Sequence, residues 1–240
     1  MKSILITGAS RGVGRELAVK CAASGKYDKI CINCLKNESA LAETAQAVEK
    51  AGNVRCITSV GNVGDIKYVE TLPREFGQID VLVNNAAISY VGLLIDMKPE
   101  EWDNVIKTNI SSIYNTCHTF VPDMIRKQSG YILNISSVWG QMGASCEVAY
   151  SAAKGAVNSF TKALAKELGP SHIQVNAAAL GIVDTEMNGH LSFDEKCDIA
   201  DDVPMGRIAS PDEIAEALLK LLDMPEYFTG EIVRIDGGWM

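Results

Sequence analysis

A glycine-rich turn near the amino terminus constrains the fold of this chain more than any other feature. An apolar run at residues 3–7 leads directly into GASRGVG at residues 8–14, and Val13, Leu17 and Cys21 then recur at helical spacing. Glycines allow positive φ angles and close backbone approach, and the N-terminus of a helix presents unpaired N–H groups to an anion. The order of strand, turn and helix therefore predicts a phosphate-binding turn of the dinucleotide type. A turn needed only for strand–helix packing is the alternative.

Strand-like and helix-like segments alternate along the whole chain of 240 residues. Further apolar runs predict strands at 29–34, 54–60, 80–87, 131–137, 173–178 and 232–235. Amphipathic patterns predict helices at 39–51, 66–76, 99–127 and 149–168, and Pro122 is expected to kink or restart the longest of them. We therefore expect an α/β fold: one Rossmann-like domain over residues 1–240, with a doubly wound parallel sheet of about seven strands flanked by helices on both faces.

In a sheet of this kind, ligands bind outside the carboxyl ends of the strands. The glycine turn, Asn84 and Asn85, Ser136 and Ser137, and Gly181 all fall at the carboxyl ends of predicted strands. We expect them to meet at one edge, with the asparagine amides tying neighbouring strands together. Asn109 lies inside a helical pattern, where asparagine is unfavourable because its amide competes for backbone groups. It is therefore either exposed or held there for a purpose.

The stretch from residue 131 to residue 154 carries the candidate chemistry. Tyr150 and Lys154 are four apart, so on a helix they share one face, and Ser137 ends the strand before them. A hydroxyl, a phenol and an ammonium around one point make a proton-donating site, although Tyr-x3-Lys alone also describes an ordinary surface pair. A free tyrosine has a pKa near ~10. Lys154 is expected to lower that value by favouring the phenolate.

The segment at residues 181–204 interrupts the alternation. It is long for a connection in a compact domain, and acidic residues outnumber the single Lys196. Long loops of this kind are typically lids or binding loops. We expect a substrate lid whose apolar residues form a short helix. Trp139, Met142 and Met187 are expected to line an apolar pocket beneath it.

The residues after the second predicted strand bear on cofactor choice. Dinucleotide folds often place an acidic residue there to bind the ribose hydroxyls of NAD. This chain has Cys34, Leu35 and Lys36 instead. Together with Arg11 in the glycine turn, Lys36 suits a 2′-phosphate, so NADP(H) is favoured over NAD(H). A solvated surface lysine is the alternative interpretation of Lys36.

Composition excludes several partners. The net charge of −8 argues against nucleic acid and against an anionic membrane surface. No apolar segment approaches the ~18 residues of a membrane span, and the amino-terminal run is too short for a signal peptide. Seven scattered cysteines argue for a reducing compartment. A strand would direct Cys31 and Cys34 to opposite sides. We expect a soluble cytoplasmic protein without a metal site.

Taken in register, these motifs resemble the short-chain dehydrogenase/reductase family over nearly the whole chain. The resemblance rests on Thr7-Gly8-x3-Gly12-x-Gly14, Asn84-Asn85-Ala86, Asn109, Ser137, Tyr150-x3-Lys154 and Asp236-Gly237-Gly238. Within the family the chain looks most like the 3-oxoacyl-[acyl-carrier-protein] reductases, because TGASRGVG, Asn62-Val63, residues 205–217 and the GEIVRIDGG ending are similar to theirs. Ala87 stands where the family usually has glycine, and Leu180 where it has proline. Lys127 and His172 are the nearest substitutes for the basic residues that contact an acidic carrier.

The resemblance implies NADPH-dependent reduction of a ketone to a secondary alcohol by hydride transfer, most like that of a 3-oxoacyl thioester in fatty acid biosynthesis. It assigns catalytic roles to Asn109, Ser137, Tyr150 and Lys154, with Asn109 holding a water that relays protons to Lys154. Two alternatives stay open. One is a reductase or dehydrogenase of a free steroid, sugar or other alcohol or ketone, and the other is a nucleotide-binding scaffold without chemistry.

The resemblance also implies the remaining site residues and the assembly. The residues expected to bind the cofactor are Gly8, Ser10, Arg11, Gly12, Val13, Gly14, Leu35, Lys36, Asn62, Val63, Asn85, Ala86, Ala87, Tyr150, Lys154, Gly181, Val183 and Thr185. Those expected to contact the substrate are Ser137, Trp139, Gln141, Met142 and Met187. A homotetramer is implied, with the carboxyl-terminal Trp239 and Met240 suited to an interface.

Overall fold

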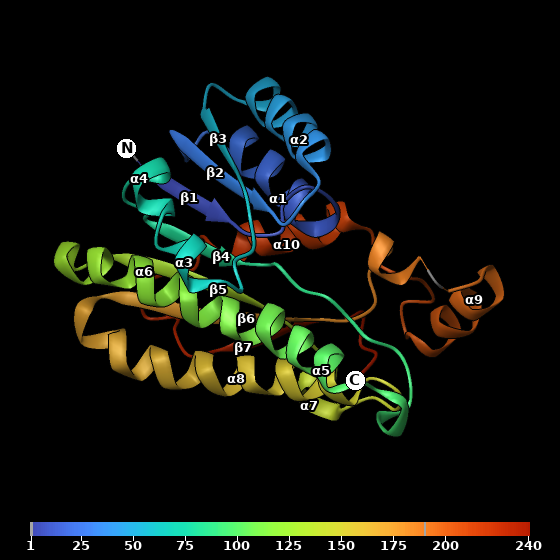
Figure 1. Ribbon diagram of the computed structural model, residues 1–240. Helices are drawn as coiled ribbons and strands as arrows, with labels where there is room; N and C mark the ends of the chain where they lie inside the picture. Colours follow the sequence, from blue (N-terminus) through green and yellow to red (C-terminus); the bar gives the residue numbers. More distant parts are fainter. Residues whose placement is uncertain (1, 190) are drawn as a thin grey trace.

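Seven parallel strands form one sheet in the computed structural model, which describes residues 2–189 and 191–240 (Figure 1). The strand order is β3-β2-β1-β4-β5-β6-β7. The strands are β1 (Ser3–Ile6), β2 (Lys29–Cys34), β3 (Arg55–Val60), β4 (Val81–Asn84), β5 (Gly130–Ser137), β6 (Ile173–Leu180) and β7 (Ile232–Ile235). The order reverses between β1 and β4, which places a ligand crevice at the carboxyl ends of these strands. The predicted parallel α/β fold is confirmed.

Helices cover both faces of the sheet. One face packs against α1 (Gly12–Ala23), α2 (Glu38–Ala51) and α10 (Pro211–Leu221), and the other against α4 (Leu72–Phe76), α6 (Ser112–Lys127) and α8 (Val148–Leu168). Alternation along β1 explains the two layers, because Ile4 and Ile6 enter the first core and Leu5 enters the second. Sequence reasoning did not predict α10, although Ser210 and Glu213 form a capping box at its start.

Two predicted helices are interrupted. The pattern at 66–76 divides into α3 (Ile66–Val69) and α4. The pattern at 99–127 consists of α5 (Pro99–Ile106), a π-helical turn η2 (Lys107–Ser111) and α6. The helix does not restart at Pro122, because α6 continues through it, and the predicted kink stays a prediction. Pro122 and His118 are both exposed, so the carbonyl that loses its intrahelical donor faces water.

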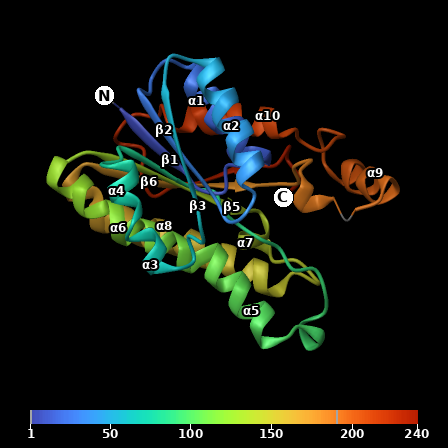
Figure 2. The same cartoon turned by 45° about the horizontal axis from the view of Figure 1, so that its top comes forward.

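The predicted lid contains the short turn η4 (Glu186–Asn188) and the helix α9 (Phe193–Asp202). Figure 2 shows α9 set apart from the sheet and its flanking helices. The remaining short elements are η1 (Leu94–Asp96), α7 (Trp139–Met142) and η3 (Gly169–Ser171). Among the described residues, no helix has both the length and the apolar character needed to cross a membrane.

Candidate active site

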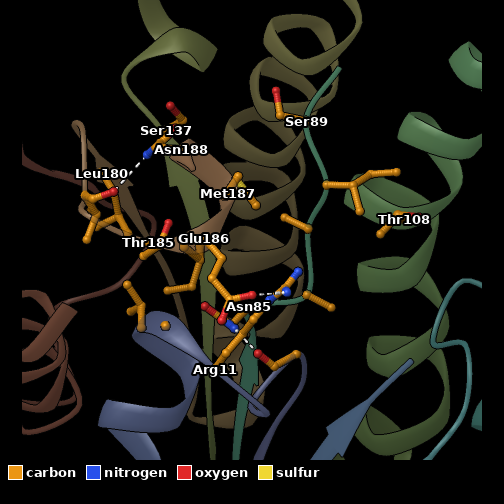
Figure 3. A pocket seen from close by; sticks show the side chains of 18 of the residues that line it. Arg11, Asn85, Ser89, Thr108, Ser137, Leu180, Thr185, Glu186, Met187 and Asn188 are labelled. Carbon is orange, nitrogen blue, oxygen red and sulfur yellow. Dashed lines mark hydrogen bonds and ion pairs between the residues drawn. The ribbon is translucent and has the colours of Figure 1, made fainter. Parts of the chain in front are cut away.

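A cavity of about 560 Å³ lies at the carboxyl ends of the central strands. The turn after β1, the residues after β2 and β4, and the ends of β5 and β6 line it. The lid covers one side, as Figure 3 shows for Thr185, Glu186, Met187 and Asn188. The cavity therefore joins the glycine turn to the stretch that carries Tyr150.

The glycine turn is shaped to receive a phosphate group. Gly8 and Gly12 have φ angles of +65° and +56°, and a Cβ at Gly8 would lie 2.7 Å from the Ala86 Cα. Helix α1 begins at Gly12 with no side-chain cap among the described residues, so its first N–H groups remain for an anion. These features fit the pyrophosphate of a dinucleotide.

Gly14 is required for close packing. It does not line the cavity. A Cβ at this position would lie 2.5 Å from Asn85 Nδ2 and 2.7 Å from the Gly8 carbonyl oxygen. The glycine therefore allows α1 to pack closely on the loop after β4, and its predicted contact with a cofactor stays a prediction.

The paired asparagines tie strands together, as the sequence indicated. Asn84 Nδ2 donates to Asn134 Oδ1 of β5 at 2.9 Å. Asn85 Nδ2 donates to the carbonyl oxygens of Thr7 and Gly8 at 2.9 and 3.0 Å. These bonds fix the glycine turn relative to β4 and β5.

Ser137, Tyr150 and Lys154 come together in the cavity wall. Ser137 is the last residue of β5, and the other two lie one turn apart near the start of α8. Ser137 and Tyr150 both line the cavity, and the Ser137 hydroxyl is close enough to lower the pKa of the phenol. Lys154 Nζ lies 5.5 Å from the centroid of the Tyr150 ring and donates to the Ile135 carbonyl oxygen at 2.7 Å. The Tyr150 phenol and the Ser137 hydroxyl thus lie in one region of the cavity wall, with the buried Lys154 ammonium beside the phenol ring.

The protonation of this group differs from the prediction. Burial raises the pKa of Tyr150 above its ordinary value, the Glu147 carboxylate raises it further, and the hydrogen bond with Ser137 lowers it in part. Burial lowers the pKa of Lys154 to about 8. The Tyr150 pKa is therefore raised overall, opposite to the expected direction, because desolvation of the phenolate dominates. The phenol keeps its proton at neutral pH, which suits a proton donor.

Asn109 is buried and held in place. It lies in the π-helical turn η2 with only 1% of its surface exposed. Its Oδ1 accepts from Ile88 N and its Nδ2 donates to Ile88 O, both at 2.8 Å. Asn109 does not line the cavity, whereas its neighbour Thr108 does. The side chain clamps the loop after β4, and its predicted role in proton relay stays a prediction.

Most of the predicted cofactor and substrate residues do line the cavity. The predicted cofactor residues that line it are Gly8, Ser10, Arg11, Gly12, Val13, Leu35, Lys36, Asn62, Val63, Asn85, Ala86, Ala87, Tyr150, Lys154, Gly181, Val183 and Thr185. Of the predicted substrate residues, Ser137, Trp139 and Met187 line it. Gln141 and Met142 do not, because they lie on the exposed side of α7.

Ser89, Glu147 and Trp239 are among the lining residues that the sequence analysis did not place in the site. Glu147 precedes α8, and its Oε2 accepts a 2.6 Å hydrogen bond from Ser89 Oγ in the loop after β4. Trp239 packs its ring edge-on against Trp139, with centroids 5.0 Å apart. The position of Glu147 three residues before Tyr150 was a usable signal, because the residue that starts a helix sits beside its first turn.

The two cationic side chains at the nucleotide end of the cavity, Arg11 and Lys36, differ in whether they form an ion pair. Arg11 forms an ion pair with Glu186 of the lid, and Figure 3 shows the two side chains pointing toward one another. Lys36 forms no ion pair with any described residue. One of the two cations predicted to bind a 2′-phosphate is therefore engaged by the lid.

Comparisons with known proteins agree with this geometry. Residues 2–196 match the family model for short chain dehydrogenase. The chain is 40% identical to YmfI of Bacillus subtilis (strain 168), named an uncharacterized oxidoreductase, over 99% of this chain and 98% of that one. It is 38% identical to the 3-oxoacyl-[acyl-carrier-protein] reductase FabG of Chlamydia trachomatis, over 99% and 96%. A solved 3-oxoacyl-[acyl-carrier protein] reductase from Brucella melitensis with bound NAD superposes with a TM-score of 0.90 at 31% identity, covering 100% of this chain and 91% of that one.

Proposed function

We propose, from the premise that this chain belongs to the short-chain dehydrogenase family and is an NAD(P)-dependent oxidoreductase of CH–OH and C=O groups, that it reduces 3-oxoacyl thioesters with NADPH. The observation that carries the proposal is the convergence of Ser137, Tyr150 and Lys154 in the wall of one cavity that is continuous with the glycine turn. The full-length similarity to a 3-oxoacyl-[acyl-carrier-protein] reductase supports the choice of substrate.

The proton step is assigned to the chain's own side chains. Tyr150, whose raised pKa keeps the phenol protonated, donates to the carbonyl oxygen of the substrate. Ser137 donates a hydrogen bond to the same oxygen as negative charge develops on it. Lys154 is held by the Ile135 carbonyl and lies beside the Tyr150 ring, where its ammonium stabilises the phenolate left after transfer.

A nicotinamide cofactor supplies the hydride in this family. The glycine turn and the N-terminus of α1 would hold its pyrophosphate, and Asn62 and Val63 would lie against its adenine. Lys36, which has no ion-pair partner among the described residues, is our reason for proposing NADPH over NADH. Arg11 joins it when the ion pair with Glu186 opens.

The proposal is limited to the thioester and leaves the carrier out. Lys127, one of the two basic residues near the expected carrier contact, pairs with Asp80 at 2.7 Å. The other, His172, contacts Glu226 at 2.6 Å. The acidic residues of α9 add negative charge close to the cavity. This surface favours a neutral thioester over a docked acidic protein, so a free ketone reductase is the second candidate.

The test is a comparison of ketone substrates with the purified protein. We expect NADPH oxidation with the N-acetylcysteamine thioester of acetoacetate, with a kcat/KM at least tenfold above that for steroid, sugar or simple cyclic ketones. A free ketone that exceeds the thioester would replace the proposal with the second candidate. Absence of turnover with every ketone would contradict both. Replacing NADPH by NADH is expected to lower kcat/KM at least tenfold.

The proposal extends to assembly and location. A homotetramer is proposed, for which Tyr114 on α6 and Val148 at the start of α8 offer exposed apolar surface. Light scattering after gel filtration tests this assembly. A cytoplasmic location is proposed from the seven cysteines, all of which are free thiols.

A further inference from the structure

Glu147 turns its side chain away from the helix that it precedes. It occupies the N-cap position of α8 with φ −127° and ψ 37°, but its carboxylate makes no capping hydrogen bond. An acidic residue at this position usually binds the free N–H groups of its own helix. Instead, Oε2 accepts from Ser89 Oγ at 2.6 Å, across the cavity wall. The backbone of the same loop is also tied here, because Gly92 N donates to the Cys146 carbonyl oxygen at 2.8 Å.

The carboxylate of Glu147 has no positive partner. Among the described residues it forms no ion pair, although it lines the cavity. The other charged side chains that line the cavity are Arg11, Lys36, Lys154 and Glu186. Arg11 is paired with Glu186, Lys36 lies at the nucleotide end, and Lys154 is bonded to the Ile135 carbonyl. The Glu147 carboxylate therefore has no ion-pair partner of its own among the described residues, and the ammonium of Lys154 beside the Tyr150 ring is the cation that this part of the cavity holds.

This charge acts where the substrate carbonyl must sit. Glu147 precedes the helix that carries Tyr150 by one residue, both side chains line the cavity, and the Glu147 carboxylate raises the pKa of the phenol. A carbonyl that accepts a proton from Tyr150 lies within hydrogen-bond distance of that oxygen. Any anionic group on the carbons beside the carbonyl enters the same field, in a site shielded from water on several sides.

We propose that Glu147 is a specificity-determining residue that rejects ketones carrying a carboxylate beside the reacting carbonyl, and so restricts the enzyme to acids masked as thioesters or esters. The proposal rests on the proposed function, because it states how the cavity distinguishes 3-oxoacyl substrates by the charge of the group at C1. The free 3-oxo acid carries a carboxylate at C1, where the thioester carries a neutral group, and the reacting ketone at C3 is the same in both. Repulsion from one unpaired carboxylate is enough to separate the two.

Acetoacetate and ethyl acetoacetate form the matched substrate pair, because both present the same C3 ketone. We expect wild type to favour the ester by at least a hundredfold in kcat/KM. Glu147→Gln keeps the shape of the side chain and an acceptor for Ser89 while removing the charge. This variant is expected to narrow the preference about tenfold, through faster reduction of acetoacetate. An unchanged preference would overturn the proposal.

Two further variants separate charge from positioning. Ser89→Ala removes the hydrogen bond but keeps the charge, so the preference for the ester should persist. Glu186→Gln removes the other cavity carboxylate, which Arg11 already neutralises, and should also leave the preference in place. If Ser89→Ala narrows the preference as much as Glu147→Gln does, Glu147 acts through loop geometry and the proposal is wrong.

Calorimetric binding of acetoacetate to the protein with NADP⁺ gives a readout that does not depend on turnover. We expect Glu147→Gln to bind acetoacetate about tenfold more tightly than wild type does. Equal binding would contradict the inference. If the acetoacetyl thioester is not a substrate but ethyl acetoacetate is, the proposed function fails. The role of Glu147 is then still decided by comparing the preference for ethyl acetoacetate over acetoacetate in wild type and in Glu147→Gln.

Discussion

The floor of the cavity and its lid are held together by different kinds of interaction. In the floor, Asn134 accepts from Asn84 and donates to Thr161 Oγ1, each at 2.9 Å. Thr116 Oγ1 donates to Asn84 Oδ1 at 2.7 Å. All four side chains are buried. This chain of hydrogen bonds joins β4, β5, α6 and α8, and so fixes the strand that ends at Ser137 relative to the helix that carries Tyr150 and Lys154.

Val183 and Val203 are buried near the two ends of the lid, and the part between them is held by exposed electrostatic contacts. Helix α9 has no buried residue along its length. Its Lys196 pairs with Asp184 of the preceding segment, and Glu186 of that segment pairs with Arg11 in the glycine turn. Exposed ion pairs contribute only about 0–1 kcal/mol each. The reacting groups are therefore set in a rigid frame, while the substrate cover can rearrange at small energetic cost.

The largest expected effect is on the chemistry that the floor supports. Tyr150→Phe removes the proton donor and leaves the ring, so kcat is expected to fall about 10³-fold while NADPH binding stays close to that of wild type. Stopped-flow absorbance and NADPH fluorescence separate the two quantities. Tyr114→Phe on α6, where the tyrosine is 52% exposed, is the matched control. Retention of more than a tenth of the activity by Tyr150→Phe would show that another group donates the proton.

The second prediction compares the loss of stability when a buried asparagine of the floor and an asparagine of the lid are each replaced by alanine. Asn134→Ala leaves the amide of Asn84 and the hydroxyl of Thr161 without their partner, so the free energy of unfolding is expected to fall by about 3 kcal/mol. Asn188→Ala removes one bond in the lid, from Nδ2 to the Val183 carbonyl oxygen, and is expected to cost under about 1 kcal/mol. Urea denaturation measures both. Equal losses would erase the distinction between floor and lid.

The third prediction concerns the energetic cost of the buried ammonium. Burial lowers the pKa of Lys154 to about 8 from 10.5. Between these values the unfolded chain binds more protons than the native state, so the contribution of this group to the free energy of unfolding rises with pH. Below pH 8 the full cost, about 3 kcal/mol, is present.

Lys154→Met removes this cost and also the charge-assisted bond to the Ile135 carbonyl, which offsets about 2 kcal/mol. The variant is therefore expected to be more stable than wild type by about 1 kcal/mol at pH 7. The difference should shrink as the pH rises from 8 toward 10. Urea midpoints at pH 7, 8.5 and 9.5 measure it. A variant less stable than wild type at pH 7 would mean that the site stabilises the charged form.

The sequence was sufficient to predict the residues whose positions follow from one strand or one helix. Ser137 ends a strand, and Tyr150 and Lys154 share a helix face, so spacing alone places them together. The contact between Ser89 and Glu147 spans 58 residues and depends on the path of a loop, which no local pattern encodes. The π-helical turn around Asn109 escaped for a related reason, because it is set by a tertiary bond to Ile88. The direction of the Tyr150 pKa shift could not be predicted from the sequence, because it is set by how deeply the folded protein buries the phenol.

The smallest expected effect on stability is that of Ile199→Ala in the lid, and this variant is expected to weaken the binding of long substrates selectively. Ile199 lies on α9 and lines the cavity, so Ile199→Ala is expected to change the free energy of unfolding by under about 0.5 kcal/mol. The same change removes apolar contact from the cover of the cavity. KM should rise about threefold for an eight-carbon 3-oxoacyl thioester, with kcat unchanged and little change for the four-carbon thioester. Phe193→Ala, where the side chain is 79% exposed and does not line the cavity, is the matched control and should move neither constant. A loss of stability in Ile199→Ala comparable to that of Asn134→Ala would mean that the lid belongs to the rigid frame.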